Sequence, residues 1–163
     1  MLRAYERLAP DLEFTHYDRV AALPHFNPDL DGDGTVLPAE VSKLRTSVNR
    51  ADVMVVSTPE YVHALPGSFK NALDWLVSDP MFAGKRVAIL HVDRGSSWAL
   101  ASLQEVLRTM NARILDTAFV ALPLGTNLVD EAAILARDDL RRLLSGSIEV
   151  LRAALQQEPN QPA

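Results

Sequence analysis

The chain has 163 residues, of which 48% are hydrophobic and 23% charged, a length and balance that suit one globular domain. A net charge of −5 without any basic block argues against a nucleic-acid partner, and the absence of cysteine excludes disulfide scaffolds and cysteine nucleophiles. No apolar run is long enough to span a membrane or resembles a signal peptide, so we expect a cytoplasmic protein without a membrane partner.

Four segments have the composition of β-strands. Residues 12–16 alternate apolar and polar side chains. Residues 53–56 and 87–90 are continuous apolar runs, which are typical of parallel strands covered on both faces. A fourth candidate lies within residues 113–122 and is most apolar at 119–122.

Helical spacing of apolar residues fills the intervals between these strands. The apolar stripes are Val41, Leu44 and Val48; Phe69, Ala72, Leu73 and Leu76; Leu100, Leu103, Leu107 and Met110; and Leu140, Leu144, Ile148, Leu151 and Leu155. Pro38 and Pro66 mark expected helix starts, and Asp130 is an expected cap of the last helix. The alternation predicts an α/β domain over residues 1–155, with a parallel sheet and helices on both faces, and a disordered tail at 156–163.

Ligands bind such sheets outside the carboxyl ends of the strands, so the loops that follow the strands are the candidate binding segments. The loop after 53–56 reads Thr-Pro-Glu-Tyr-Val-His-Ala-Leu-Pro-Gly from Thr58 to Gly67 and leads directly into an expected helix. This long motif resembles the signature of the NADPH-dependent FMN reductases, a flavodoxin-like family of flavin and quinone reductases. Supporting similarity at 23–30 and 82–88 follows in family order.

The resemblance implies that the first of these loops holds the flavin ring of FMN. The turn at Pro59, Glu60 and Tyr61 would offer backbone N–H groups to the polar edge of the ring. Val62 stands where the family often has Asn, a change that spares a backbone contact but not a side-chain amide contact. His63 would lie beside the flavin or the nicotinamide, or be an exposed loop histidine. A purely structural loop, whose Pro and Tyr only set its shape, is the alternative.

The loop after 87–90 corresponds to a glycine-containing loop that approaches the flavin in relatives. Here the resemblance assigns Asp93, Arg94 and Gly95 to the flanks of the flavin. Arg94 would stabilise anionic flavin or meet the nicotinamide nucleotide's phosphates, or else be a solvated charge. The expected cofactor-binding residues are thus Pro59, Glu60, Tyr61, Val62, His63, Asp93, Arg94 and Gly95, with no catalytic acid or base and no metal ligand.

The implied function is a reductase in which NADPH or NADH reduces bound FMN, which then passes electrons to a flavin, a quinone or a similar small acceptor. The resemblance also implies a homodimer or homotetramer, with Trp75 either in the core or at a subunit contact. The competing interpretation is a non-catalytic flavodoxin-like remnant or interaction protein that has lost FMN binding.

One family element is not found in the sequence. The chain opens on what resembles the last turns of the family's first helix, without the first strand or its Gly-Ser-x-Arg-type phosphate loop, and a truncated gene model or fragment is our preferred interpretation. In the strand order 2-1-3-4-5 the first strand is central. We therefore expect 53–56 to lack a neighbour, or 12–16 to shift beside it, and FMN to bind weakly.

A metal site is a weaker hypothesis. Residues 29–40 fit the calcium-loop pattern of the EF-hand, but Pro24 and Pro28 oppose the entering helix that the pattern requires. The histidines have no metal-ligand spacing, although His63 and His91 both follow or end predicted strands and could approach each other.

Overall fold

The computed structural model describes every residue except Asp33, Arg94, Ser96, Ser97, 125–129 and 158–163. The helices are α1 (Leu2–Arg7), α2 (Ala39–Arg50), α3 (Gly67–Val77), α4 (Trp98–Thr109), α5 (Glu131–Ala136) and α6 (Asp138–Leu155). The strands are β1 (Val53–Val56), β2 (Arg86–Val92), β3 (Arg113–Ile114) and β4 (Val120–Leu122). Short 3-10 turns are η1 (Val20–Ala22), η2 (Pro28–Leu30) and η3 (Asp116–Ala118).

All strand pairs in the described residues are parallel, as the alternation of strands and helices predicts. Strand β1 pairs with β2, in a register that sets Val53 beside Arg86. Strands β3 and β4 pair with successive parts of β2, so residues 113–122 behave as one strand interrupted by η3. The predicted fourth strand is therefore confirmed, in two pieces.

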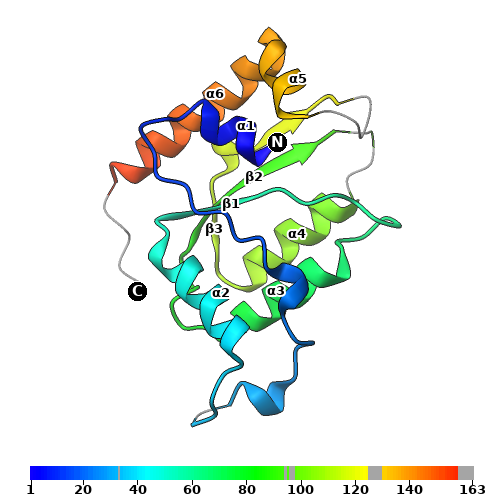
Figure 1. Ribbon diagram of the computed structural model, residues 1–163, viewed down its shortest axis with the longest axis vertical. Coiled ribbons are helices and arrows are strands. Elements are labelled where there is room, and N and C mark those ends of the chain that lie inside the picture. Colours follow the sequence, from blue (N-terminus) through cyan, green and yellow to red (C-terminus); the bar gives the residue numbers. More distant parts are fainter. Residues whose placement is uncertain (33, 94, 96–97, 125–129, 158–163) are drawn as a thin grey trace.

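Helices cover both faces of this sheet, and the apolar runs of the strands divide between the two sides (Figure 1). Met54 and Val56 of β1 face the cluster formed with α2, α3 and α4, whereas Val53 and Val55 face the cluster formed with α1 and α6. Strand β2 divides in the same way. Because alternate side chains enter opposite cores, the runs 53–56 and 87–90 are apolar at every position, and the α/β prediction with helices on both faces is confirmed.

The predicted helical stripes are the buried faces of four helices. The buried residues of the stripes are Val41, Leu44 and Val48 on α2 and Leu140, Leu144, Ile148 and Leu151 on α6. The other two stripes bury Ala72, Leu73, Leu76, Leu103, Leu107 and Met110, and they bury Phe69 and Leu100 in part. Trp75 is fully buried, and its indole N–H donates to the Pro24 carbonyl at 2.8 Å. Of the two places expected for Trp75, the structure puts it in the core.

The prediction of a strand at 12–16 was wrong. Leu12 and Phe14 do pack on the α1–α6 side, and the Phe14 ring meets the Tyr5 ring edge-on with centroids 6.2 Å apart. The alternation of apolar and polar residues at 12–16 therefore reflects the partial burial of Leu12 and Phe14. A strand also needs a backbone partner, however, and within the described residues β1 pairs with β2 alone. The segment thus does not shift into pairing beside β1.

Asp130 was predicted to cap the last helix, but it caps the short helix that precedes the last one. Its carboxylate accepts from the Ala133 N–H at 2.8 Å at the start of α5. The helical conformation is interrupted at Arg137, and α6 begins at Asp138. Ile134 and Leu140 are buried on both sides of the break, so the apolar pattern runs through it.

The end of α6 is fixed by an arginine from the sheet. The guanidinium of Arg86, at the start of β2, donates to the Ala154 carbonyl at 2.7 Å and to the Gln157 carbonyl at 2.9 Å. Gln156 and Gln157, the first residues of the predicted tail, continue the last helical turn, and the rest of that tail lies outside the described residues.

The segment with the calcium-loop pattern has a structural use for one of its acids. The carboxylate of Asp31 pairs with Arg45 of α2 at 2.7 Å and also accepts from the Ser78 hydroxyl. Among the described residues no group of three or more His, Asp or Glu side chains is placed to hold a metal ion. In the same part of the chain, no helix combines the length and apolar character needed to cross a bilayer.

Candidate functional site

The loop after β1 forms a tight turn at the carboxyl rim of the sheet. Tyr61 and Ala64 exchange two backbone hydrogen bonds, of 3.1 and 3.0 Å, which leave Val62 and His63 as the two central residues. Leu65 then enters the core, and Pro66 is the residue directly before the first turn of α3. Figure 1 shows this loop at the same end of the sheet as the arrowhead of β2.

Both central residues of the turn have positive φ, 52° at Val62 and 56° at His63. This is the geometry of a type I′ turn, which favours Asn and Gly. A β-branched residue is rare there because its Cβ crowds the backbone. The departure from Asn at position 62 therefore places strain in the loop that carries the motif.

The same turn presents unpaired donors. In the described part of the chain the backbone N–H groups of Val62 and His63 have no hydrogen-bond acceptor, and the Val62 side chain is 100% exposed. Tyr61 and Pro59 are exposed as well. The turn thus offers two N–H groups and a phenol ring on an open surface at the edge of the sheet.

Glu60 ties this loop to the next one. Its Oε2 accepts from the Ala99 N–H at 2.8 Å, in the first turn of α4. The first N–H groups of a helix lack partners within the helix, so a carboxylate from elsewhere is a favourable acceptor there. The motif glutamate therefore positions two rim loops relative to each other through its side chain.

The loop after β2 supplies the second half of the rim. The Asp93 N–H donates to the Leu122 carbonyl at 2.9 Å, which joins this loop to the end of β4. The Asp93 carboxylate accepts from the Gly95 N–H at 3.0 Å, and Gly95 has φ 75°. Arg94, also predicted at the site, lies outside the described residues.

The two histidines have different aromatic neighbours. His63 lies against Trp98, the first residue of α4, with ring centroids 6.0 Å apart and a 30° interplanar angle. His91 of β2 stacks instead near Phe119, with centroids 6.4 Å apart. Each histidine thus has a different ring partner.

Known proteins provide the decisive comparison. The family model described as NADPH-dependent FMN reductase matches residues 1–127. The chain belongs to this family. An NAD(P)H-dependent FMN reductase of Pseudomonas aeruginosa is 28% identical over 138 residues, which cover 82% of this chain and 74% of that protein. A quinone reductase of Escherichia coli is 36% identical over 90 residues, which cover 53% of this chain and 47% of that protein, so the match extends over about half of the relative.

The fold agrees with the family. The flavoenzyme FerB of Paracoccus denitrificans, an NAD(P)H:acceptor oxidoreductase, superposes with a TM-score of 0.67 at 22% identity, over 94% of this chain and 88% of that one. The predicted family, its flavodoxin-like fold and its chemistry, FMN reduced by NAD(P)H, are therefore confirmed at the level of the family.

The residues of the rim fit FMN in one respect that this structure tests. A flavin ring carries carbonyl and nitrogen acceptors along its polar edge, and the turn after β1 has two N–H donors with no partner in the described chain. The space beside the turn is open, since Tyr61, Val62 and His63 are all exposed. Two surface hollows lie away from this turn. One of about 570 Å³ lies between Leu8 and the start of α6, and one of about 200 Å³ lies around residues 77–83.

Trp98 was missed at the sequence level. The residue begins α4 but stands off the apolar stripe of that helix, and its side chain is 63% exposed. An aromatic residue outside the stripe of an amphipathic helix is the signal that could have found it. Its proximity to His63 could not be predicted, because it depends on how two loops meet.

Proposed function

We propose that this chain is an NAD(P)H-dependent reductase that uses bound FMN to pass electrons to a small organic acceptor. The single observation that carries the proposal is the turn at Tyr61–Ala64, whose two central N–H groups have no acceptor among the described residues and stand at the carboxyl rim of a flavodoxin-like sheet. The match of the family model over that same segment supports this interpretation.

In this proposal the N–H groups of Val62 and His63 bind the polar edge of the ring. Pro59 and the Glu60–Ala99 bond hold the turn in place, and Asp93 and Gly95 flank the ring from the second loop, together with Arg94. When bound, FMN supplies a two-electron carrier between the nicotinamide and the acceptor. Backbone donors near the ring stabilise negative charge there, so the chain needs no acid or base for the first half of the reaction.

A quinone is the acceptor that the relatives suggest, since one of them is named a quinone reductase. The protein would work as a homodimer or homotetramer in the cytoplasm, where NAD(P)H is available, with one domain over residues 1–155. The residues that contact the nucleotide decide whether the protein prefers NADPH or NADH, so both nucleotides are used in the test below.

The test is a titration of the purified chain with FMN and with riboflavin, followed by visible absorbance and flavin fluorescence. We expect both flavins to bind with similar, weak affinity, because the rim residues named here contact the ring and not the phosphate. Oxidation of NADPH or NADH at 340 nm, dependent on added FMN and 1,4-naphthoquinone, completes the test. A chain that binds neither flavin, or binds FMN and leaves NAD(P)H unoxidised, would contradict the proposal.

A further inference from the structure

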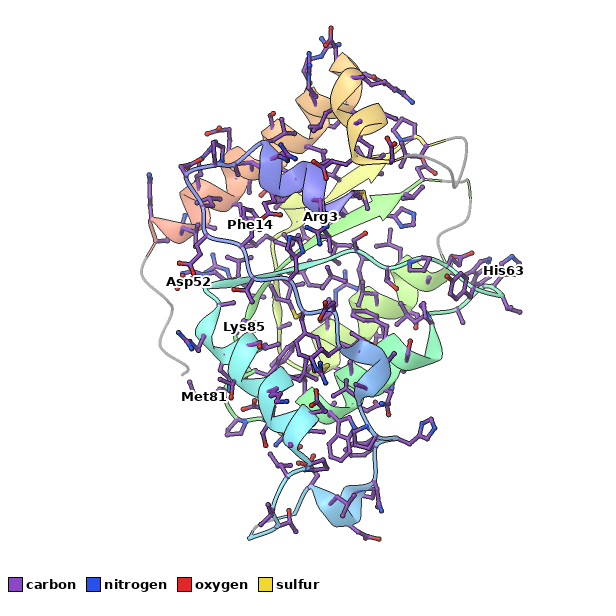
Figure 2. The ribbon with its side chains drawn as sticks, in the orientation of Figure 1. Arg3, Phe14, Asp52, His63, Met81 and Lys85 are labelled. Atoms are coloured by element: carbon purple, nitrogen blue, oxygen red, sulfur yellow. The ribbon has the colours of Figure 1, made fainter. Side chains whose placement is uncertain are left out.

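Large apolar side chains are exposed at one place on the carboxyl rim. Tyr61 is 63% exposed and Val62 fully so, and they share a turn with His63, whose ring lies near that of Trp98. Figure 2 shows His63 projecting at the outer end of this loop. We call the two rings of His63 and Trp98 the rim platform.

The platform is held in position by the fold. Trp98 begins α4, and the next residue, Ala99, donates its N–H to Glu60 in the loop that carries His63. His63 itself sits at positive φ, in a turn closed by two backbone hydrogen bonds. Strained, over-determined backbone of this kind concentrates at ligand sites. Two separate restraints therefore keep the rings together.

The other tryptophan shows how unusual the exposure is. Trp75 is entirely buried, and its N–H is paired with a carbonyl. Trp98 leaves most of its side chain in water, where burial of such a ring would be favourable. An exposed, positioned indole beside a cofactor rim has a face available for stacking.

We propose that the rim platform stacks against the planar ring of the electron acceptor and selects flat aromatic acceptors over compact inorganic anions. The proposal rests on the proposed function and names residues that set its specificity. Aromatic faces attract other flat rings in offset or tilted arrangements, whereas a compact anion has no face to stack.

A second copy of the chain is the main competing occupant. A stable interface buries about 800 Å² on each partner and involves about 20–30 residues a side. The rim platform together with Tyr61 and Val62 offers four residues. It lies where ligands bind this class of sheet, at the carboxyl ends of the strands. These features favour a small ring as the occupant.

The experiment compares the chain with Trp98→Ala, Trp98→Phe and His63→Asn, where Asn tolerates positive φ but removes the ring. The measured quantity is kcat/KM for 1,4-naphthoquinone divided by kcat/KM for ferricyanide, at saturating FMN and NADH. We expect Trp98→Ala and His63→Asn each to lower this ratio about fivefold, and Trp98→Phe to restore it to within about twofold. Met81→Ala is the matched control, because Met81 is equally exposed but lies on the opposite side of the molecule from His63 (Figure 2).

Tryptophan emission gives a readout independent of turnover. Since Trp75 is buried, saturable quenching of Trp98 emission by 1,4-naphthoquinone that weakens in His63→Asn but not in Met81→Ala reports contact at the platform. Failure of FMN to bind or to be reduced by NAD(P)H would overturn the proposed function instead. Normal flavin reduction with an unchanged acceptor ratio would overturn the platform alone. An unchanged ratio together with loss of a dimer in Trp98→Ala, measured by light scattering, would assign the platform to a second copy and overturn the proposal.

Discussion

The carboxylate of Glu60 accepts a hydrogen bond from the Ala99 N–H at 2.8 Å, and this bond joins the loop after β1 to the first turn of α4. The two loops approach the same rim from neighbouring parallel strands. A glutamate whose place in the motif suggests a ligand contact is therefore engaged with the protein itself. Its effect on a bound flavin passes through the position of the turn.

Replacing Glu60 by Ala should weaken both the fold and flavin binding. Removal of a helix N-terminal acceptor costs about 1 kcal/mol of unfolding free energy, within a range of about 0.5–2. The loosened turn should also bind FMN several-fold more weakly. Urea unfolding and flavin titration measure the two effects separately.

Glu60→Gln is the matched control for this change. The amide oxygen can still accept from Ala99, so Gln should retain most of the stability and lose only the interaction of the charge with the helix end. Should Ala and Gln variants unfold at the same urea concentration as the parent, the bond would contribute nothing to stability.

Replacing Val62 by Asn should stabilise the protein. Val62 has φ 52°, a conformation that costs a β-branched residue about 1 kcal/mol more than Asn. The gain should appear as a higher midpoint in thermal and urea unfolding. FMN affinity should be preserved, because the backbone N–H group is unchanged.

Val36→Asn is the control for the loss of an exposed valine. Val36 is 92% exposed, and it is absent from the positive-φ residues of the described chain. Equal effects at positions 36 and 62 would show that any gain comes from placing an amide in water instead of an isopropyl group, and not from relief of backbone strain.

The sequence predicted the elements whose local pattern matches their surroundings. The runs at 53–56 and 87–90 are apolar at every position because each strand faces two cores, and such short unbroken runs are characteristic of buried parallel strands. The motif from Thr58 to Gly67 likewise located the rim loop and the start of α3.

The remaining features depend on partners distant in the sequence. Residues 12–16 have a strand-like pattern, but pairing depends on a neighbouring backbone that the local pattern does not encode. The positive φ of Val62 contradicts its residue type, so no propensity argument would have placed it. The Glu60–Ala99 and His63–Trp98 contacts each require two loops to meet.

Replacing Arg86 by Met should destabilise the end of α6. Arg86 is buried, and its planar fork donates to the Ala154 and Gln157 carbonyls, groups that a helix end cannot satisfy internally. Loss of these donors should lower the unfolding free energy by about 2 kcal/mol. Arg86→Lys, with one compact ammonium group, should lie between Met and the parent in urea unfolding. A Lys variant less stable than Met would contradict the capping role.

Tyr5, Ser147 and Ala118 form a buried chain of hydrogen bonds between α1, α6 and η3. The Ser147 hydroxyl donates to the Ala118 carbonyl at 2.7 Å, so its single proton is used, and the Tyr5 hydroxyl must donate to Ser147 at 2.8 Å. Tyr5→Phe leaves Ser147 bonded to Ala118 and should cost about 1 kcal/mol. Ser147→Ala leaves both the Tyr5 phenol and the Ala118 carbonyl without a hydrogen-bond partner and should lower the unfolding free energy by about 2–3 kcal/mol. The reverse order in urea unfolding would contradict this assignment of donors.

The same phenol should make the protein sensitive to alkali. Burial raises the pKa of Tyr5 above its usual 10.0 and outweighs the charge of Arg152, which lowers it. In the unfolded chain the phenol ionises first, so its contribution to stability is complete below about pH 10 and is lost as the pH rises toward the folded-state pKa. The limiting slope is about 1.4 kcal/mol per pH unit. Unfolding free energies at pH 8, 10 and 11 should therefore fall less steeply in Tyr5→Phe than in the parent, whereas Ser147→Ala, which keeps the buried phenol, should retain the parent's slope. Parallel curves for Tyr5→Phe and the parent would show that this phenol does not control alkaline unfolding.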